Sequence, residues 1–169
     1  MKLSLATISA FLLLLSFVSA AQEYEVPTSL PTTKEEFIKS EKDLIATAKW
    51  LESTPIGTDM EKRRKANAWV VMWVTNSPTV TIGLRPSIIY LFETNRELLS
   101  MYVAGYTRYC LENNYSTDTL KCNVAGIRAA INCYNLGGQV VNDEGLNKVI
   151  DADKEGKLED WVKEAMKSE

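Results

Sequence analysis

Apolar side chains recur every three or four residues along most of this chain, and that spacing constrains its fold more than any other feature. Residues three and four apart share one face of an α-helix, whereas a half-buried strand would alternate apolar and polar residues. The helical spacing is clearest from Leu98 to Cys110 and from Leu120 to Tyr134. The sequence therefore predicts an all-α fold, a single compact domain of about five to seven helices.

Capping and helix-breaking residues predict where the helices begin and end. A threonine followed three residues later by a glutamate has the capping-box pattern, and the chain has it at Thr33 and at Thr58. The helices that these residues begin are expected to end before Pro55 and Ser77. The segment Thr79–Leu84 is the only stretch with strand-like residues. Further helices are expected from Pro86 in two pieces hinged near Thr94-Asn95, then up to Gly137-Gly138, and near Asp143–Ala152 and Leu158–Lys167.

The first twenty residues have the pattern of a cleavable secretory signal peptide. Lys2 precedes an apolar run, and Val18-Ser19-Ala20 supplies small or apolar residues at the positions that a signal peptidase reads. The apolar run is shorter than the roughly 20 residues that span a membrane, although an uncleaved anchor is the alternative. We expect residues 1–20 to be a signal peptide, residues 21–32 an extended N-terminal arm, and residues 33–169 the helical domain.

The length and charge of the exported part limit what it can bind. Removing residues 1–20 from the 169 leaves about 149 residues, a length typical of one domain. The formal net charge of the whole chain is −3, and the loss of Lys2 makes it −4. Nucleic-acid-binding domains are usually basic, so we expect no nucleic-acid partner. We also expect no transmembrane segment after cleavage, and a periplasmic or extracellular location.

The composition excludes several kinds of chemistry. The chain has no histidine, which excludes Ser-His-Asp and Cys-His catalysis, histidine acid–base catalysis and most zinc sites. Three cysteines, Cys110, Cys122 and Cys133, are too few for a disulfide-dense scaffold. The odd number leaves at least one of them free or paired with another molecule. We therefore expect a fold that rests on its hydrophobic core, with no cofactor and no metal.

The two longest apolar stripes predict a central antiparallel helix hairpin with its turn near residue 116. Residues whose numbers sum to about 231 or 232 then face each other, which pairs Gly105 with Gly126 and Cys110 with Cys122. Glycine inside a helix costs about 1 kcal/mol relative to alanine, so two glycines at matched depth indicate close packing, although chance could also place them there. If a disulfide forms, Cys110–Cys122 is the expected pair; three reduced, buried cysteines are the alternative.

An acidic segment near the C-terminus resembles part of a calcium-binding loop. Asp151, Asp153, Glu155 and Gly156 match the first, third, fifth and sixth positions of such a loop. Val162, however, occupies the twelfth position, where calcium needs a bidentate carboxylate. The end of one helix and the start of the next explain the segment better.

The basic run Lys62–Lys65 near the start of the second helix is a candidate anion-binding patch. Such a run is more often a solvated helix face whose charges pair with nearby acids, here Asp59 and Glu61. The solvated face is therefore the expected interpretation.

Aromatic residues supply the candidate binding site. Trp69 and Trp73 lie one helical turn apart, and Tyr102, Tyr106 and Tyr109 follow a similar stripe on a later helix. Exposed together, these rings would form a platform for a glycan or an extended peptide. Aromatic stripes at helical spacing are more often part of a core, so burial is the alternative.

Without histidine, catalysis would depend on two carboxylates held about 5–10 Å apart. Glu93 and Glu97 could form such a pair, but 22 acidic residues give this pattern little specificity, and we assign no catalytic residue. The triplet Asn114-Tyr115-Ser116 fits an N-glycosylation site in an expected turn.

The function that these features favour is binding: an accessory, inhibitor-like or partner-binding protein whose partner is an unknown protein, peptide or glycan. The alternatives are a carboxylate-dependent glycan hydrolase and a small-molecule carrier with an apolar cavity between its helices.

Overall fold

A computed structural model describes residues 24–167, and the predicted signal peptide, residues 1–20, lies outside them. The described chain is all-helical, which confirms the predicted fold class. Its elements are α2 (Lys34–Ser53), α3 (Met60–Asn76), α4 (Pro86–Ile89), the 3-10 helix η2 (Tyr90–Phe92), α5 (Glu97–Glu112), α6 (Thr119–Asn135), α7 (Glu144–Lys154) and α8 (Leu158–Ala165). No helix among residues 24–167 is both long and apolar enough to cross a membrane.

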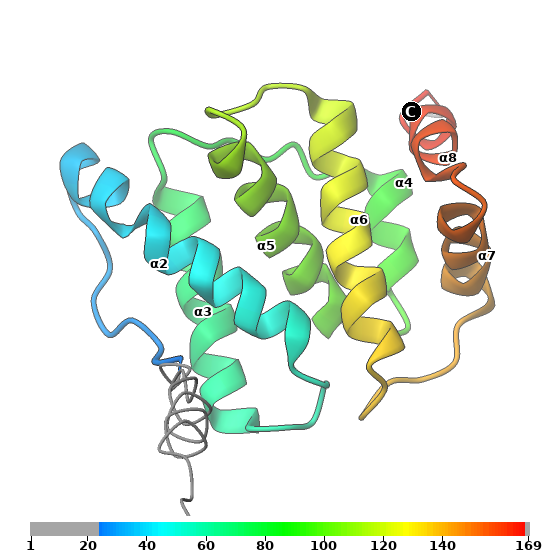
Figure 1. Ribbon diagram of the computed structural model, residues 1–169, viewed down its shortest axis with the longest axis horizontal. Helices are drawn as coiled ribbons and strands as arrows, with labels where there is room; N and C mark the ends of the chain where they lie inside the picture. The colour runs from blue at the N-terminus through cyan, green and yellow to red at the C-terminus, as the bar shows by residue number, and fades with distance from the viewer. Residues whose placement is uncertain (1–23, 168–169) are drawn as a thin grey trace, which may run out of the picture.

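The helices pack around a central pair, α5 and α6 (Figure 1). In the view of Figure 1, α2 crosses in front of α3 to the left of α5, α4 lies behind α6, and α7 and α8 stand at the edge beside α6. The largest buried side chains come from all of these layers and form one core; they include Leu44, Trp73, Phe92, Tyr102, Ile127 and Leu158.

The central pair has the register that the sequence predicts. A Cβ atom added to Gly105 would collide with the Cβ of Ala129 and lie 3.3 Å from the Cα of Gly126. At the turn end of the hairpin, the Sγ atoms of Cys110 and Cys122 are 3.3 Å apart, as free thiols. The two glycines are therefore needed for close contact between the helices, and a Cys110–Cys122 disulfide stays a prediction.

One of the two predicted capping boxes forms. The Thr33 hydroxyl accepts a hydrogen bond from the Glu36 N–H, and the Glu36 carboxylate accepts one from the Thr33 N–H. The second prediction was wrong, because α3 begins at Met60. The Thr58 N–H bonds to the carbonyl of Pro55, so Thr58 belongs to the preceding turn.

The described part of the predicted N-terminal arm, residues 24–32, contains no helix and packs against α2 and α3. Tyr24 stacks on Trp50 with ring centroids 5.0 Å apart, and Lys62 lies over both rings. Farther along, the indole N–H of Trp69 donates to the carbonyl of Ser29 at 2.9 Å. The arm is therefore part of the packed domain.

Candidate ligand-binding groove

The aromatic residues singled out in the sequence do not share a surface. Trp69, Trp73, Tyr102 and Tyr106 are buried, and Tyr109 is half-buried against the core. Trp73 packs edge-on against Phe37, and Tyr102 and Tyr106 pack against each other. The core interpretation of the four buried rings is therefore confirmed, and a ligand at the surface cannot reach them as a platform.

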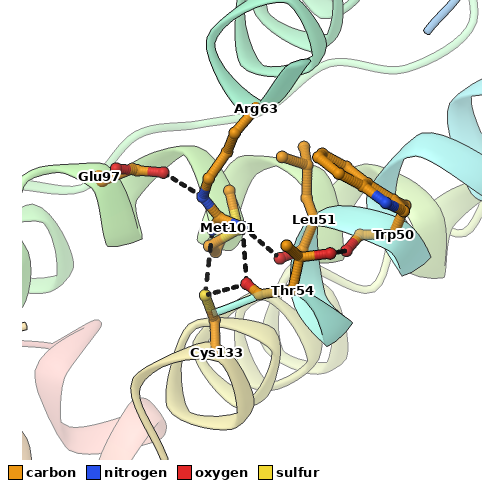
Figure 2. A network of polar contacts seen from close by, with 7 residues as sticks. All are labelled: Trp50, Leu51, Thr54, Arg63, Glu97, Met101 and Cys133. Carbon is orange, nitrogen blue, oxygen red and sulfur yellow. Dashed lines mark hydrogen bonds and ion pairs between the residues drawn. The ribbon is translucent and has the colours of Figure 1, made fainter. Parts of the chain in front are cut away.

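The basic run does not form one patch either, because its second residue turns inward. Arg63 is 2% exposed, pairs with Glu97 of α5, and donates to the carbonyl oxygens of Leu51 at 3.1 Å and Thr54 at 2.7 Å. It also lies 3.2 Å from the Sγ of Cys133 on α6. Figure 2 shows Arg63 reaching from α3 between these groups. Arg63 therefore joins helices and caps the C-terminus of α2.

Two other cations of the run, Lys62 and Lys65, have local partners. The ammonium of Lys65 pairs with Glu61 one turn earlier at 2.7 Å, and Lys62 lies over Tyr24 and Trp50. Arg64 is exposed. These contacts are those of a solvated face and a docked arm.

Burial favours the neutral forms of the Cys110 and Cys133 thiols and of the Tyr106 phenol. Burial, together with a hydrogen bond to Cys122, raises the pKa of the Cys110 thiol, and burial raises the pKa of Tyr106 to about 12. Burial also raises the pKa of Cys133, although Arg63 beside it acts in the opposite direction. A thiol must lose its proton to act as a nucleophile, so the raised pKa disfavours nucleophilic chemistry at Cys110 and Cys133.

The two candidate catalytic carboxylates have different surroundings. Glu97 is engaged by Arg63, whereas Glu93 is exposed. Elsewhere, Glu52 pairs with Arg108 at 2.9 Å. A glycosidase needs two carboxyl groups that face each other across a cleft, which the ion pair of Glu97 and the exposure of Glu93 do not favour.

The acidic C-terminal segment is the end of a helix, as expected. Asp151 lies in α7 and pairs with Lys154, while Asp153 pairs with Arg128 of α6 at 2.8 Å. Gly156 has φ +73°, which suits the residue that follows a helix. Within residues 24–167, no group of three or more Asp, Glu, Cys or His side chains is placed to hold a metal ion.

A surface groove with a volume of about 450 Å³ lies between α3, α5 and the segment that connects α3 to α4. Its α3 wall includes Val71, and its α5 wall consists of Leu99, Ser100 and Val103. Val71 is 45% exposed. Because no charged side chain lines the groove, its walls are those of an apolar ligand site.

The third wall of the groove is the connecting segment, which crosses behind α5 in Figure 1. Val80, Thr81, Ile82 and Leu84 of this segment line the groove. Val80 is 5% exposed and anchors the segment, whereas Leu84 remains 50% exposed. The stretch predicted to be strand-like therefore lacks helical structure but has no partner strand within the described chain.

Sequence reasoning did not single out the groove. One signal was present, because the strand-like residues Thr79–Leu84 stand alone in a helical chain and would need a neighbour to complete a sheet. Comparisons of the chain with protein-family models, curated proteins and solved structures find no match.

Proposed function

We propose that the protein is an exported binding protein that holds an uncharged, apolar part of another molecule in this groove. The observation that carries the proposal is the groove itself, which combines a volume of about 450 Å³ with walls that lack charge. Sites for small ligands and for ligand side chains commonly have this volume and this apolar character. Export rests on the signal-peptide pattern of residues 1–20.

The walls limit what can bind. A charged group placed in the groove would lose hydration without gaining an ionic partner, which is unfavourable. An apolar group would instead cover half-exposed side chains such as Val71 and Leu84 and gain the free energy of removing them from water. The expected occupant is therefore apolar where it enters the groove.

Two neighbouring residues of α3 provide a matched test. Val71 lines the groove, whereas Met72 does not, and their exposed fractions are 45% and 47%. The probe is anilinonaphthalene sulfonate, a dye whose fluorescence rises at apolar sites, titrated into folded wild type, Val71→Glu and Met72→Glu. We expect saturable binding to the wild type, a loss of about tenfold in affinity for Val71→Glu, and little change for Met72→Glu, because only the first places a charge in the groove.

Circular dichroism and the melting temperature would establish that both variants are folded. The proposal would be refuted if the wild type shows no saturable binding, or if the two substitutions weaken binding equally.

A further inference from the structure

We propose that the groove binds an extended peptide segment of a partner protein, which adds as a β-strand to residues 81–84 and places alternate apolar side chains in the groove. This inference rests on the proposed function and names its class of ligand. Strand addition needs a stretch of backbone with unpaired polar groups beside a pocket for alternate side chains. Residues 81–84 are not helical, and Thr81, Ile82 and Leu84 line the groove.

The backbone of the segment has unused hydrogen-bonding groups. The Val80 N–H donates to the Ser77 hydroxyl at 3.2 Å. From Thr81 to Leu84, by contrast, no backbone N–H or C=O bonds to another group of the described chain. Such groups keep their hydrogen bonds only through water or through a partner. A peptide strand would supply N–H donors and C=O acceptors at the same spacing as the unpaired groups of residues 81–84.

The segment is also accessible at alternate positions. A Cβ atom added to Gly83 would meet no other atom within 4 Å, and Thr81 is exposed. Val80 and Ile82 point their side chains toward the protein, since one is buried and the other half-buried. From Val80 to Gly83, burial therefore alternates as at a sheet edge, with one face packed and one face open.

A peptide fits this site better than a second copy of the chain. A symmetric dimer would bring two copies of the same surface together. Here that surface is a groove. Two grooves that face each other would enclose a space, and their apolar side chains would not come into contact. A projecting strand can instead enter the groove and, at the same time, pair with the backbone of residues 81–84.

The test uses the peptide acetyl-Lys-Val-Thr-Val-Thr-Val-Lys-amide and two methylated forms, one with N-methyl groups on all three valines and one with N-methyl groups on both threonines. In a strand, the N–H groups of alternate residues point to opposite edges. A strand that adds to one edge therefore needs only one of the two sets. Binding would be measured by calorimetry, and hydrogen exchange would follow the amides of Thr81–Leu84.

We expect the unmethylated peptide to bind wild type and Met72→Glu but to bind Val71→Glu at least about tenfold more weakly. One methylated form should lose about tenfold or more in affinity, and the other should bind within about threefold of the parent peptide. Alternate amides among residues 81–84 should exchange at least about tenfold more slowly with the peptide, and at an unchanged rate with anilinonaphthalene sulfonate.

The inference would be overturned if the peptide does not bind, or if both methylated forms bind as the parent does and the amides stay unprotected. It would also be overturned if these amides are protected without peptide in a sample that sediments as a dimer. Continued binding of anilinonaphthalene sulfonate to the wild type, with the loss in Val71→Glu, would then leave the proposed function standing. Loss of both kinds of binding would refute the proposed function as well.

Discussion

A guanidinium group has five N–H donors in one plane, and Arg63 uses them to join three other helices to α3. Two donors reach the last carbonyls of α2, which have no partner inside that helix. Others reach Glu97 and Met101 of α5 and Cys133 of α6. A buried charge is stable only when its donors are satisfied in this way.

Replacement of Arg63 should therefore be costly. We expect Arg63→Ala to lower the free energy of unfolding by about 3–5 kcal/mol, because the carbonyls of α2 and the carboxylate of Glu97 lose their partner. Arg64→Ala, at the neighbouring exposed position, should change it by less than about 0.5 kcal/mol. Urea denaturation of the two variants measures both values, and equal effects would contradict the structural role of Arg63.

The sequence pattern indicates that Arg63 is buried, although its place in a run of four basic residues suggests a solvated position. Residues 63, 66, 70 and 73 follow the helical spacing of three and four, and all four are buried. A basic residue on an apolar stripe indicates a buried, paired cation. What the pattern could not supply is the partners, since Glu97 and Cys133 lie 34 and 70 residues away along the chain.

The buried phenol of Tyr106 predicts a loss of stability at alkaline pH. The unfolded chain ionises this group near its ordinary pKa of 10.0, whereas the folded protein holds the proton until about pH 12. The contribution of the Tyr106 phenol to the free energy of unfolding is therefore fully present below about pH 10 and is lost between pH 10 and 12.

Tyr106→Phe should reduce that loss by about 1 kcal/mol at pH 11. Tyr90→Phe is the control substitution, because Tyr90 is 70% exposed. Urea denaturation at pH 8 and pH 11 makes the comparison. A wild-type loss that Tyr106→Phe leaves intact would contradict the assignment.

At the scale of elements, the apolar spacing predicted the helices well, and the small residues of α5 and α6 predicted how those two pair. Capping was predicted less reliably, because Thr58 and Glu61 have the right spacing but take part in other contacts, with Pro55 and Lys65. The groove was not predicted. Val71 and Leu84 look like any apolar residues in the sequence, and only the packed structure leaves them uncovered.

The hairpin register can be tested at its closest contact. In Gly105→Ala the added methyl group would collide with Ala129, so we expect a net loss of about 1–2 kcal/mol, since overpacking outweighs the gain in helix propensity. Gly145→Ala is the control, because its Cβ would meet only a carboxylate oxygen of Asp143, at 3.2 Å. That variant should stay within about 1 kcal/mol of the wild type in thermal unfolding. A stabilised Gly105→Ala would show that the helices are farther apart.

At the scale of the whole molecule, the polar and apolar surfaces have different roles. The carboxylates Glu52, Glu97, Glu112 and Asp153 are each paired with a lysine or arginine, and these pairs join neighbouring elements. The groove has no such pairs, and its apolar walls stay open to solvent. Binding is therefore the function that we propose, in place of a carboxylate-dependent hydrolase.

The most direct test of this account is a map of where an apolar probe binds. Amide chemical shifts of the labelled protein would be followed by nuclear magnetic resonance while anilinonaphthalene sulfonate is added. We predict that the largest shifts come from all three walls of the groove, at Val71, Ile82 and Val103, while the exposed residues Tyr90 and Val141 are unaffected. Shifts that cluster away from the groove, or that spread evenly over the exposed apolar residues, would contradict the proposal that the groove is the binding site.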